Sequence, residues 1–217
     1  MRRDAFLGRV SAATMNSTLP EAPRVLPALP ELPAADLVTL FRTRAQAITT
    51  VVHGPMSRHG VPRAVVGIAA GHGAAGFLAW DDLPVSGVSA ALQSAGGERL
   101  AHEVPAESRI EHNLSYLDVA LGVTGADAAL AESGSVVLIH GRGRPRMASL
   151  APEVHVVLLE ADRIRRTLAH WAHAEPDRAL ITSNLVIVTG PSRTGDIEQR
   201  LNLGVHGPRH VHVVIIR

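Results

Sequence analysis

The sequence predicts an α/β fold: a mostly parallel central sheet flanked by helices on both faces, with an N-terminal helical arm. Two observations support this prediction. Short runs of Val, Ile and Leu recur along the chain without polar interruptions, as expected for strands that are buried on both faces. These runs alternate with segments whose apolar residues have helical spacing, which is the order of elements in α/β proteins. At 217 residues, 46% of them hydrophobic, the chain is long enough to bury a sizeable core.

The first 33 residues are predicted to stand apart from the main domain. Phe6, Leu7 and Val10 have helical spacing, which indicates a short amphipathic helix. A series of prolines then favours an extended strap over packed structure: Pro20, Pro23, Pro27, Pro30 and Pro33. We therefore divide the chain into a helix and proline-rich strap at 1–33 and an α/β domain at 34–217.

The first half of the main domain is predicted to contain three helices and three strands. Asp36 is a suitable N-cap for a helix that continues to Ile48 and has one apolar face. The elements expected after this helix are a buried strand at 63–69, a helix at 86–95, a strand at 117–124, a short helix at 126–131 and a strand at 135–139.

The second half is predicted to contain three more strands and a helix. The strands lie at 154–159, 185–188 and 211–216, and the helix at 164–174. A glycine-rich turn-and-helix element is expected between the last two strands.

Composition excludes several kinds of chemistry. The chain has no cysteine, so it cannot form disulfides, thiolate metal sites or cysteine-ligated iron–sulfur clusters. Its basic residues are all arginine, so it lacks the lysine of a P-loop or a Schiff base. The apolar runs are far shorter than the roughly 20 residues that span a bilayer, and no secretion signal is evident. We expect a cytoplasmic protein without a membrane span.

Nucleic-acid and dinucleotide binding are not expected either. A formal net charge of +1 does not provide the basic stripe of a nucleic-acid interface. The glycines at 71–76 follow a predicted strand and resemble the dinucleotide fingerprint G-x-G-x-x-G. However, no acidic residue ends a second strand roughly 20 residues later, as that site requires. We therefore reject NAD binding.

One candidate site follows the predicted strand at 117–124. Gly125 opens a turn at the end of that strand, and Glu132 and Gly134 precede the next strand. Ligand sites of open α/β sheets lie at the carboxyl ends of strands. A carboxylate held there can act as a base or a nucleophile, which makes Glu132 the catalytic candidate. The alternative is that Glu132 caps a helix end or binds a backbone amide.

A second candidate site is the basic loop after the strand at 135–139. Arg142, Arg144 and Arg146 lie within five residues of one another, and Ser149 follows them. Guanidinium groups bind carboxylate or phosphate in a bidentate manner, so this loop is expected to face an anion. The alternative is a solvated basic loop balanced by nearby acids.

A third candidate site lies between the last two strands, where a Gly-Pro turn precedes a predicted helix start. Hydroxyls, free amides and an arginine at a helix start suit an anionic group. The candidate residues are Gly190, Ser192, Arg193, Thr194, Asp196, His206 and Gly207. The alternative is a turn whose polar side chains bond only to their own backbone. We expect Glu132, Arg146 and Arg193 to line one shared cavity.

The sequence contains 12 histidines, and three of them lie near the last strand: His206, His210 and His212. A metal site needs three converging imidazoles or a carboxylate as the third ligand. Because buried or structural histidines are commoner, we predict no metal ion.

Four blocks of sequence, in order, resemble the lactate-utilisation protein C family (LutC/YkgG, the LUD domain). They are Ala-Glu-Ser-Gly-Ser-Val-Val-Leu from Ala131, Arg-Met-Ala-Ser-Leu-Ala-Pro-Glu-Val-His from Arg146, Gly-Pro-Ser-Arg-Thr-Gly-Asp-Ile-Glu from Gly190, and Gly-Val-His-Gly-Pro-Arg from Gly204. The similarity covers roughly residues 60–217.

The resemblance implies a fold of the NagB/RpiA/CoA-transferase-like superfamily. It also implies partners, because these proteins are encoded with two iron–sulfur proteins that together support oxidation of L-lactate to pyruvate. The clusters would then lie on the partner subunits, with no cofactor in this chain. CoA transferases of the superfamily use a Glu in an E-x-G turn as the acyl-accepting nucleophile, and Glu132-Ser-Gly resembles that turn.

Three functions are compatible with these observations. The first is a non-redox component of an L-lactate utilisation system, in which Arg146, Ser192 and Arg193 bind a small carboxylate and partner subunits accept the two electrons. The second is a stand-alone enzyme resembling CoA transferases or sugar-phosphate isomerases that uses Glu132. The third is a ligand-binding module that senses a small acid. A protruding N-terminal arm would suit a homodimer or a hetero-complex.

Overall fold

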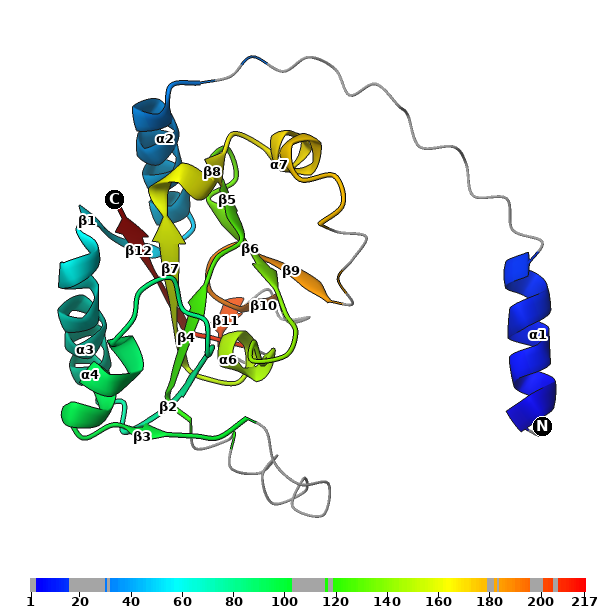
Figure 1. The fold of residues 1–217 in the computed structure, drawn as a ribbon, viewed down its shortest axis with the longest axis horizontal. Coiled ribbons are helices and arrows are strands. Elements are labelled where there is room, and N and C mark those ends of the chain that lie inside the picture. The colour runs from blue at the N-terminus through cyan, green and yellow to red at the C-terminus, as the bar shows by residue number, and fades with distance from the viewer. Residues whose placement is uncertain are drawn as a thin grey trace.

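The computed structural model describes residues 3–15, 30, 32–102, 116, 119–178, 182, 184–195, 201–204 and 207–217. A six-stranded sheet forms its centre, and helices and a second sheet cover the two faces (Figure 1).

The central sheet is parallel at every pair of neighbouring strands. The strand order is β1 (Val51–Met56), β12 (His210–Ile216), β7 (Val154–Glu160), β4 (Leu121–Gly125), β2 (Gly76–Ala79) and β3 (Glu98–Arg99). β12 pairs with β7 along its whole length, from His210 opposite Val154 to Ile216 opposite Glu160. The prediction of a mostly parallel sheet built from continuous Val, Ile and Leu strands is confirmed.

Two helices cover one face of this sheet: α3 (Val61–Gly71), which follows a 3-10 turn η1 (Arg58–Gly60), and α4 (Val88–Ser94). Val61 and Val65 of α3 pack with Leu92 of α4 against valines of β4, β7 and β12. Pro62 occupies the first turn of α3, where its missing N–H leaves no helical hydrogen bond unmade.

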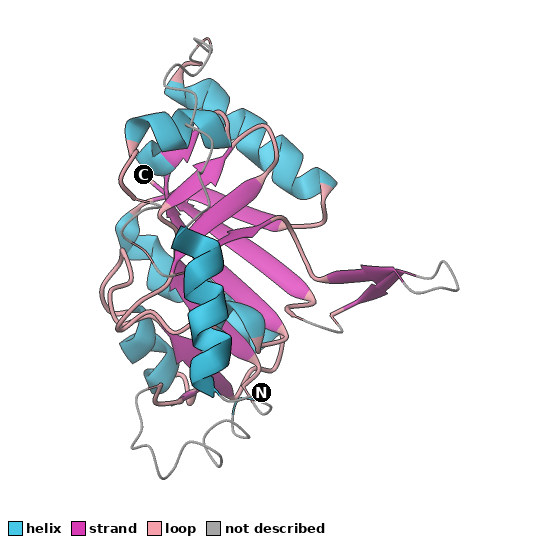
Figure 2. Ribbon diagram, turned by 90° about the vertical axis from the view of Figure 1, so that its right-hand side faces the viewer, coloured by secondary structure: helices cyan, strands magenta, loops and turns pink. Residues whose placement is uncertain are grey.

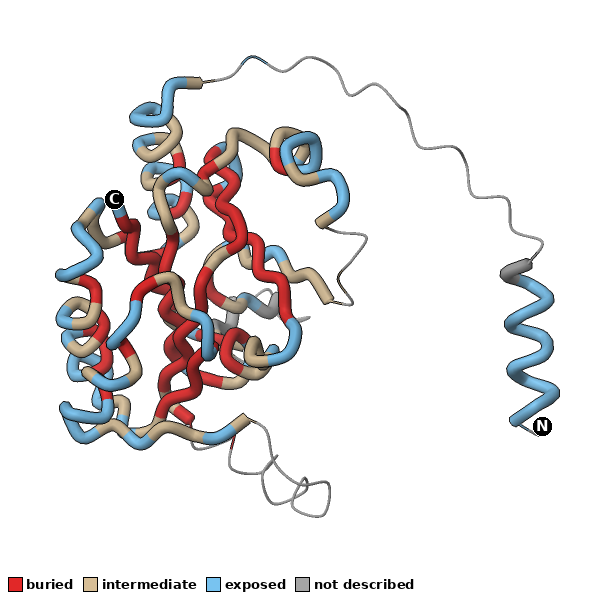
Figure 3. Tube along the Cα trace, in the orientation of Figure 1, coloured by how far each residue is buried: buried red, intermediate tan, exposed pale blue. Residues whose placement is uncertain are grey.

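The opposite face is covered by α2 (Ala34–Ala47), by α6 (Met147–Leu150) and by the second sheet. Phe41 and Ala45 of α2 are completely buried. α6 lies directly on β4 at Gly122, because a Cβ atom at that glycine would be 1.8 Å from the carbonyl oxygen of Ala148. Figure 3 shows that the buried chain is concentrated in the strands between these layers.

The sequence did not reveal the second sheet. Its strands follow the order β8 (Ile164–Arg165), β5 (Ala128–Leu130), β6 (Ser135–Ile139) and β9 (Leu185–Val188), and β6 is antiparallel to both of its neighbours. The 3-10 turn η4 (Ala161–Arg163) leads from β7 into β8. α7 (Leu168–Ala174) packs on this sheet through Trp171.

A short antiparallel hairpin forms the remaining element, β10 (Arg193–Gly195) with β11 (Leu201–Leu203). Figure 2 shows it extending away from the body of the domain. The sequence predicted a turn and a helix in this region. The two strands lie on either side of residues 196–200, where the helix was predicted; these five residues, which include Asp196, lie outside the described residues.

Three predictions of secondary structure were wrong. Residues 63–69 belong to α3, whose buried residues Val61, Val65, Ile68 and Ala69 have helical spacing. The predicted helix at 126–131 contains β5, because pairing with β6 and β8 overrides the helix propensity of its alanines. The predicted helix at 164–174 begins as β8 and is helical only from Leu168.

The ends of two predicted N-terminal elements also differ in detail. α2 begins at Ala34 with Pro33 as its N-cap, so Asp36 lies in the first turn and makes no capping bond. The predicted helix at the N-terminus is present as α1 (Arg3–Met15), in which Phe6 is 52% exposed. Of the predicted strap, the structure describes only residues 30, 32 and 33.

Candidate functional site

A cavity of about 140 Å³ lies where parallel strands β2, β4 and β7 end. We call it the carboxyl-edge cavity. Its lining residues are Trp80, Asp82, Pro84, Gly125, Ala126, Asp127, Arg144, Glu160, Arg163 and Arg178. Ligands of open α/β sheets bind at this edge, because the loops that leave the strands there can be varied without changing the sheet. This is therefore the best-placed ligand site among the described residues.

Asp127 is the central side chain of this cavity. It follows β4 through Gly125 and Ala126, and its backbone N–H donates to the carbonyl oxygen of Val137 at 2.9 Å. Its side chain is 3% exposed, and its Oδ2 accepts a hydrogen bond from the amide of Ile139 at 2.8 Å. The carboxylate is thus fixed by the second sheet and presented to the end of the first.

Arg144 connects Asp127 to the loop after β2. Its Nη1 lies 3.1 Å from Asp127 Oδ1, and its Nε and Nη2 lie 2.8 and 2.6 Å from Asp82 Oδ2. The hydrogen bonds that it donates to Asp82, together with the charges of both acids, raise the pKa of Arg144. The guanidinium carbon also lies 4.9 Å from the centre of the Trp80 ring, a cation–π contact. Arg144 is held rigidly.

In the described part of the chain, Arg163 and Arg178 use only some of their guanidinium donors. Arg163 donates from Nε to Glu160 at 3.2 Å and from Nη1 to the carbonyl oxygen of Asp127 at 3.4 Å. Arg178 donates from Nη2 to Asp127 at 3.1 Å. Its Nε is buried and makes no hydrogen bond, although Glu175 Oε2 lies 3.4 Å away. The Arg178 side chain as a whole is 37% exposed, so its guanidinium group is open to an acceptor on a ligand in the cavity.

The formal charges of the residues that line the cavity sum to zero. Three arginines and three carboxylates line it, and Arg58 adds an ion pair to Glu160. A neutral lining with spare guanidinium donors favours one small anion that forms directed hydrogen bonds over a highly charged ligand.

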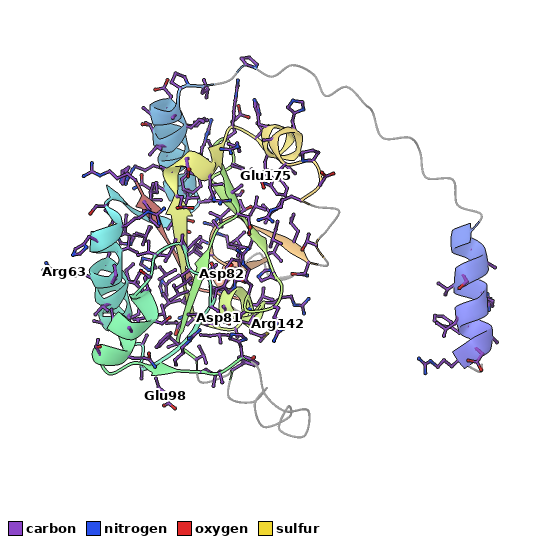
Figure 4. All side chains as sticks on the ribbon, in the orientation of Figure 1. Arg63, Asp81, Asp82, Glu98, Arg142 and Glu175 are labelled. Atoms are coloured by element: carbon purple, nitrogen blue, oxygen red, sulfur yellow. The ribbon has the colours of Figure 1, made fainter. Side chains whose placement is uncertain are left out.

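A second, more open cavity of about 380 Å³ lies beside the first, at the end of β2 and β3. Its charged residues form one cluster in which Asp81 binds Arg99 Nη2 at 2.7 Å and His102 Nε2 at 3.2 Å. The hydrogen bond from His102 is the main reason why the pKa of Asp81 is lowered. Asp81 and Asp82 follow each other, so the two cavities share one loop (Figure 4).

The basic loop contributes to the carboxyl-edge cavity through one of its three arginines. Arg144 and the predicted Gly125 line the cavity, whereas Arg142 and Arg146 are exposed. Figure 4 shows Arg142 on the same side as the aspartates that follow β2. Ser149 is 2% exposed, and its hydroxyl contacts His140 Nε2 at 3.3 Å and donates to the carbonyl oxygen of Arg146 at 3.1 Å.

Glu132 lies on the turn between β5 and β6, outside the cavity. Its side chain is 44% exposed and accepts a hydrogen bond from Arg166 Nε at 2.6 Å. Gly134 in the same turn has a φ of +68°, and a Cβ atom there would be 2.4 Å from the amide nitrogen of Ala45 in α2. Close packing against α2 therefore requires the glycine of the E-x-G turn. The catalytic role of Glu132 stays a prediction.

The third predicted group gathers at the opposite, amino-terminal edge of the central sheet. Arg193 Nη2 donates to Ile48 and Thr49, just before β1. Ser192 donates its amide to Pro208, just before β12, and Gly207 packs against its side chain. Gly190 packs against the carbonyl oxygen of Ile48. The side chain of Thr194 and all of Asp196 and His206 lie outside the described residues.

The expectation that Glu132, Arg146 and Arg193 line one shared cavity stays a prediction. Among the described residues, no hydrogen bond or ion pair joins Glu132, Arg146 and Arg193. They lie on the β5–β6 turn, at the start of α6 and at the amino-terminal edge of the sheet, respectively. Within the same residues, no three His, Asp or Glu side chains are grouped so that they could hold a metal ion.

Comparison with known proteins gives the family. Residues 38–216 match the LUD domain. The chain belongs to the LUD domain family. The matched region begins after the first turn of α2. It includes the remainder of that helix, the later helices and both sheets.

Two relatives of this LUD domain are named Lactate utilization protein C. The protein from Geobacillus sp. (strain WCH70) is 32% identical over 69% of the chain, and that from Anoxybacillus flavithermus (strain DSM 21510 / WK1) is 36% identical over 44% of the chain. The matched segments cover 65% and 43% of those two proteins. The crystal structure of a DUF162 family protein from Deinococcus radiodurans has a TM-score of 0.61 at 18% identity, covering 86% of this chain and 99% of the other. That similarity confirms the fold.

Several lining residues of the LUD domain were missed by the sequence analysis. Asp127 follows the strand that was predicted at 117–124, and Glu160 and Arg163 directly follow the one at 154–159, so their positions at strand ends were a usable signal. Asp82 follows β2, for which the sequence had predicted no strand. Arg178 comes from the segment after α7 and has no such signal. No helix in the described part of the chain is long and apolar enough to cross a membrane.

Proposed function

We propose that this LUD domain binds a small carboxylic acid in the carboxyl-edge cavity and acts as a non-redox component of an L-lactate utilisation system. The names of its relatives support the second half of this proposal. The observation that supports the first half is that Arg163 and Arg178, whose side chains are 41% and 37% exposed, line this cavity together with Arg144.

The size of the cavity favours a molecule like lactate or pyruvate. A volume of 140 Å³ corresponds to a few water molecules at about 30 Å³ each. A three-carbon acid fits this space, and its carboxylate can accept hydrogen bonds from Arg178 and Arg163. The flat side of Trp80 is taken by Arg144, so this ring shapes the cavity wall and does not stack on the ligand.

Oxidation of lactate to pyruvate releases two electrons and two protons. The chain has no cysteine with which to hold an iron–sulfur cluster. In this proposal, the clusters that accept the electrons belong to iron–sulfur partner subunits, and the LUD domain supplies binding and orientation of the acid.

Calorimetric titration of the purified chain tests the binding step. L-Lactate and pyruvate are expected to bind, and propionate, which lacks the oxygen at carbon 2, more weakly. Arg178→Gln should weaken binding at least about tenfold, since a hydrogen bond to a charged group contributes about 1.5–3 kcal/mol. Arg63→Gln is the matched control because Arg63 is exposed on α3, far from the cavity (Figure 4). Equal affinity of Arg178→Gln and wild type would reject the cavity as the site.

Association with partners is tested separately. Tagged chain is purified from cells grown on L-lactate, and the iron content of the copurifying proteins is measured. Copurification of iron–sulfur proteins, with loss of growth on L-lactate when this chain is removed, supports the assembly. A chain that purifies alone from such cells and is dispensable for growth on L-lactate contradicts it.

A further inference from the structure

Four histidines from distant parts of the chain meet on the α3-covered face of the central sheet. His53 lies on β1, His72 is the C-cap of α3, and His210 and His212 lie on β12. His212 is at the centre: its Nδ1 is 3.0 Å from His53 Nε2 and its Nε2 is 3.0 Å from His72 Nε2. The ring of His210 lies 4.7 Å from that of His72. We call these four residues the histidine cluster.

Two hydrogen bonds link the ring of His212 to those of His53 and His72, and both bonds can form when all three rings are neutral. Each hydrogen bond needs one N–H group and one lone pair, and a neutral imidazole provides one of each. One extra proton can still be accommodated if His212 donates in both directions. A second proton would place two N–H groups face to face at 3.0 Å. The hydrogen-bonded geometry therefore tolerates at most one charged ring.

Among the described residues, the charges that act on His53 and His212 are all positive, and Glu153, which precedes β7 beside His210, is paired with Arg209. Burial lowers the pKa of His212 to about 4, and the charges of His53, His72 and His210 act in the same direction. Burial and the charge of Arg42 lower the pKa of His53. No carboxylate among the described residues contributes to either shift. Protonation of this cluster is therefore not compensated from α2, α3, β1 or β12.

We propose that the histidine cluster is an acid-sensitive latch, which holds the end of α3 against β1 and β12 at neutral pH and releases it when the rings are protonated. The latch is independent of the proposed function, because it lies at the amino end of β12 whereas the cavity lies where β2, β4 and β7 end. His72 precedes β2 and Trp80 follows it, so one strand joins the latch to the cavity.

The difference between the pKa of His212 in the latched and released states determines how strongly release depends on pH. In the released state His212 regains an ordinary pKa near 6.5, so that release takes up a proton below this pH. With a latched value of about 4, the equilibrium constant for release rises about 30-fold between pH 8 and pH 5. The expected behaviour is a local opening that grows as the pH falls, while the remainder of the fold stays closed.

Hydrogen exchange at several pH values, corrected for the intrinsic rate of exchange, tests this proposal. The reporters are the amides of His72, Gly73 and Ala74, which donate to the last carbonyl oxygens of α3. Their protection should fall more than tenfold from pH 8 to pH 5. The amides of Ala91 and Ala95 in and after α4 serve as the internal reference and should keep their protection.

Two variants assign the effect to the cluster. His212→Gln removes the ring whose protonation drives release and keeps a polar side chain of similar size; its reporter amides should show the same protection at pH 8 and pH 5, whether that protection is high or low. His59→Gln is the control, since His59 is exposed on η1 and outside the cluster, and it should respond like wild type. Unchanged protection of the wild type at pH 5, or a wild-type response in His212→Gln, would overturn the latch.

Discussion

The carboxylate of Asp127 accepts a hydrogen bond from Arg178 at 3.1 Å, although 51 positions separate the two residues in sequence. Asp127 leads from the central sheet into the second sheet, and Arg178 follows the helix that packs on the second sheet. The same carboxylate binds Arg144 from a third segment. One buried acid thus holds together three walls of the cavity, and replacing it tests how far the site depends on it.

Asp127→Asn should lower the free energy of unfolding by about 3 kcal/mol, because breaking a buried ion pair leaves its partners uncompensated. The side chain keeps its size and one oxygen for the amide of Ile139, so the loss reports on the two arginines. Urea unfolding measures the change. Asp162→Asn, at an exposed acid with no recorded ion pair in the described structure, is the control and should stay within about 0.5 kcal/mol of wild type. Equal stabilities of the two variants would contradict the role assigned to Asp127.

Gly122→Ala should destabilise the domain by about 1–3 kcal/mol or more, because the new methyl group would overlap the carbonyl oxygen of Ala148 and displace α6. Gly67→Ala is the matched comparison on α3. A methyl group there meets nothing within 4 Å, and alanine is the better helix former, so this variant should gain about 0.5–1 kcal/mol. Urea denaturation of both variants checks the opposite signs.

Stability should fall as the pH decreases below about 6.5, partly because of His155. This ring is completely buried, and burial lowers its pKa to about 3. Between these values the unfolded chain binds a proton that the folded chain does not, so acid favours unfolding. The contribution of this ring between pH 7.5 and pH 5 is about 2 kcal/mol.

His155→Gln tests that contribution. The amide can still bond to the hydroxyl of Thr124, which now contacts His155 Nε2 at 2.9 Å, but it does not titrate. The variant is expected to lose less stability than wild type between pH 7.5 and pH 5. An identical loss in both proteins would mean that the buried ring does not set this pH dependence.

Glu132→Gln separates the E-x-G turn from the cavity. The residue is exposed and its ion pair with Arg166 is at the surface, so the free energy of unfolding should change by less than about 1 kcal/mol. Because Glu132 does not line the carboxyl-edge cavity, calorimetry should give the same affinity for L-lactate as wild type. A tenfold loss of affinity would return Glu132 to the binding site.

The sequence was informative where the local pattern and the final packing agree. Strands β7 and β12 are buried on both faces, so their runs of Val, Ile and Leu, each interrupted by one histidine, were sufficient to identify them. α3 was mistaken for a strand because it too is rich in valine and is buried along much of its length. β5 was mistaken for a helix because its alanines acquire their strand geometry only from β6 and β8.

The site was predictable only in part for a related reason. Gly125 and Arg144 lie directly beside strands whose ends could be located from the sequence. Arg178 reaches Asp127 through the fold of the second sheet, which left no trace that periodicity could detect. The glycines at 134 and 190 looked like ligand-binding positions, but both are small because α2 and the residue after it pack against them. The sequence alone does not distinguish a glycine that leaves room for a ligand from one that lets a neighbouring helix pack closely.

β12 lies between β1 and β7, so the first strand of the sheet has no neighbour until residues 210–216 have been synthesised. The chain emerging from the ribosome must carry β1 unpaired while more than a hundred residues follow it. Contacts that span so much sequence form slowly, and an unpaired strand edge is open to association with other chains in the meantime. Production of this domain should therefore respond to chaperones that shield nascent polypeptides.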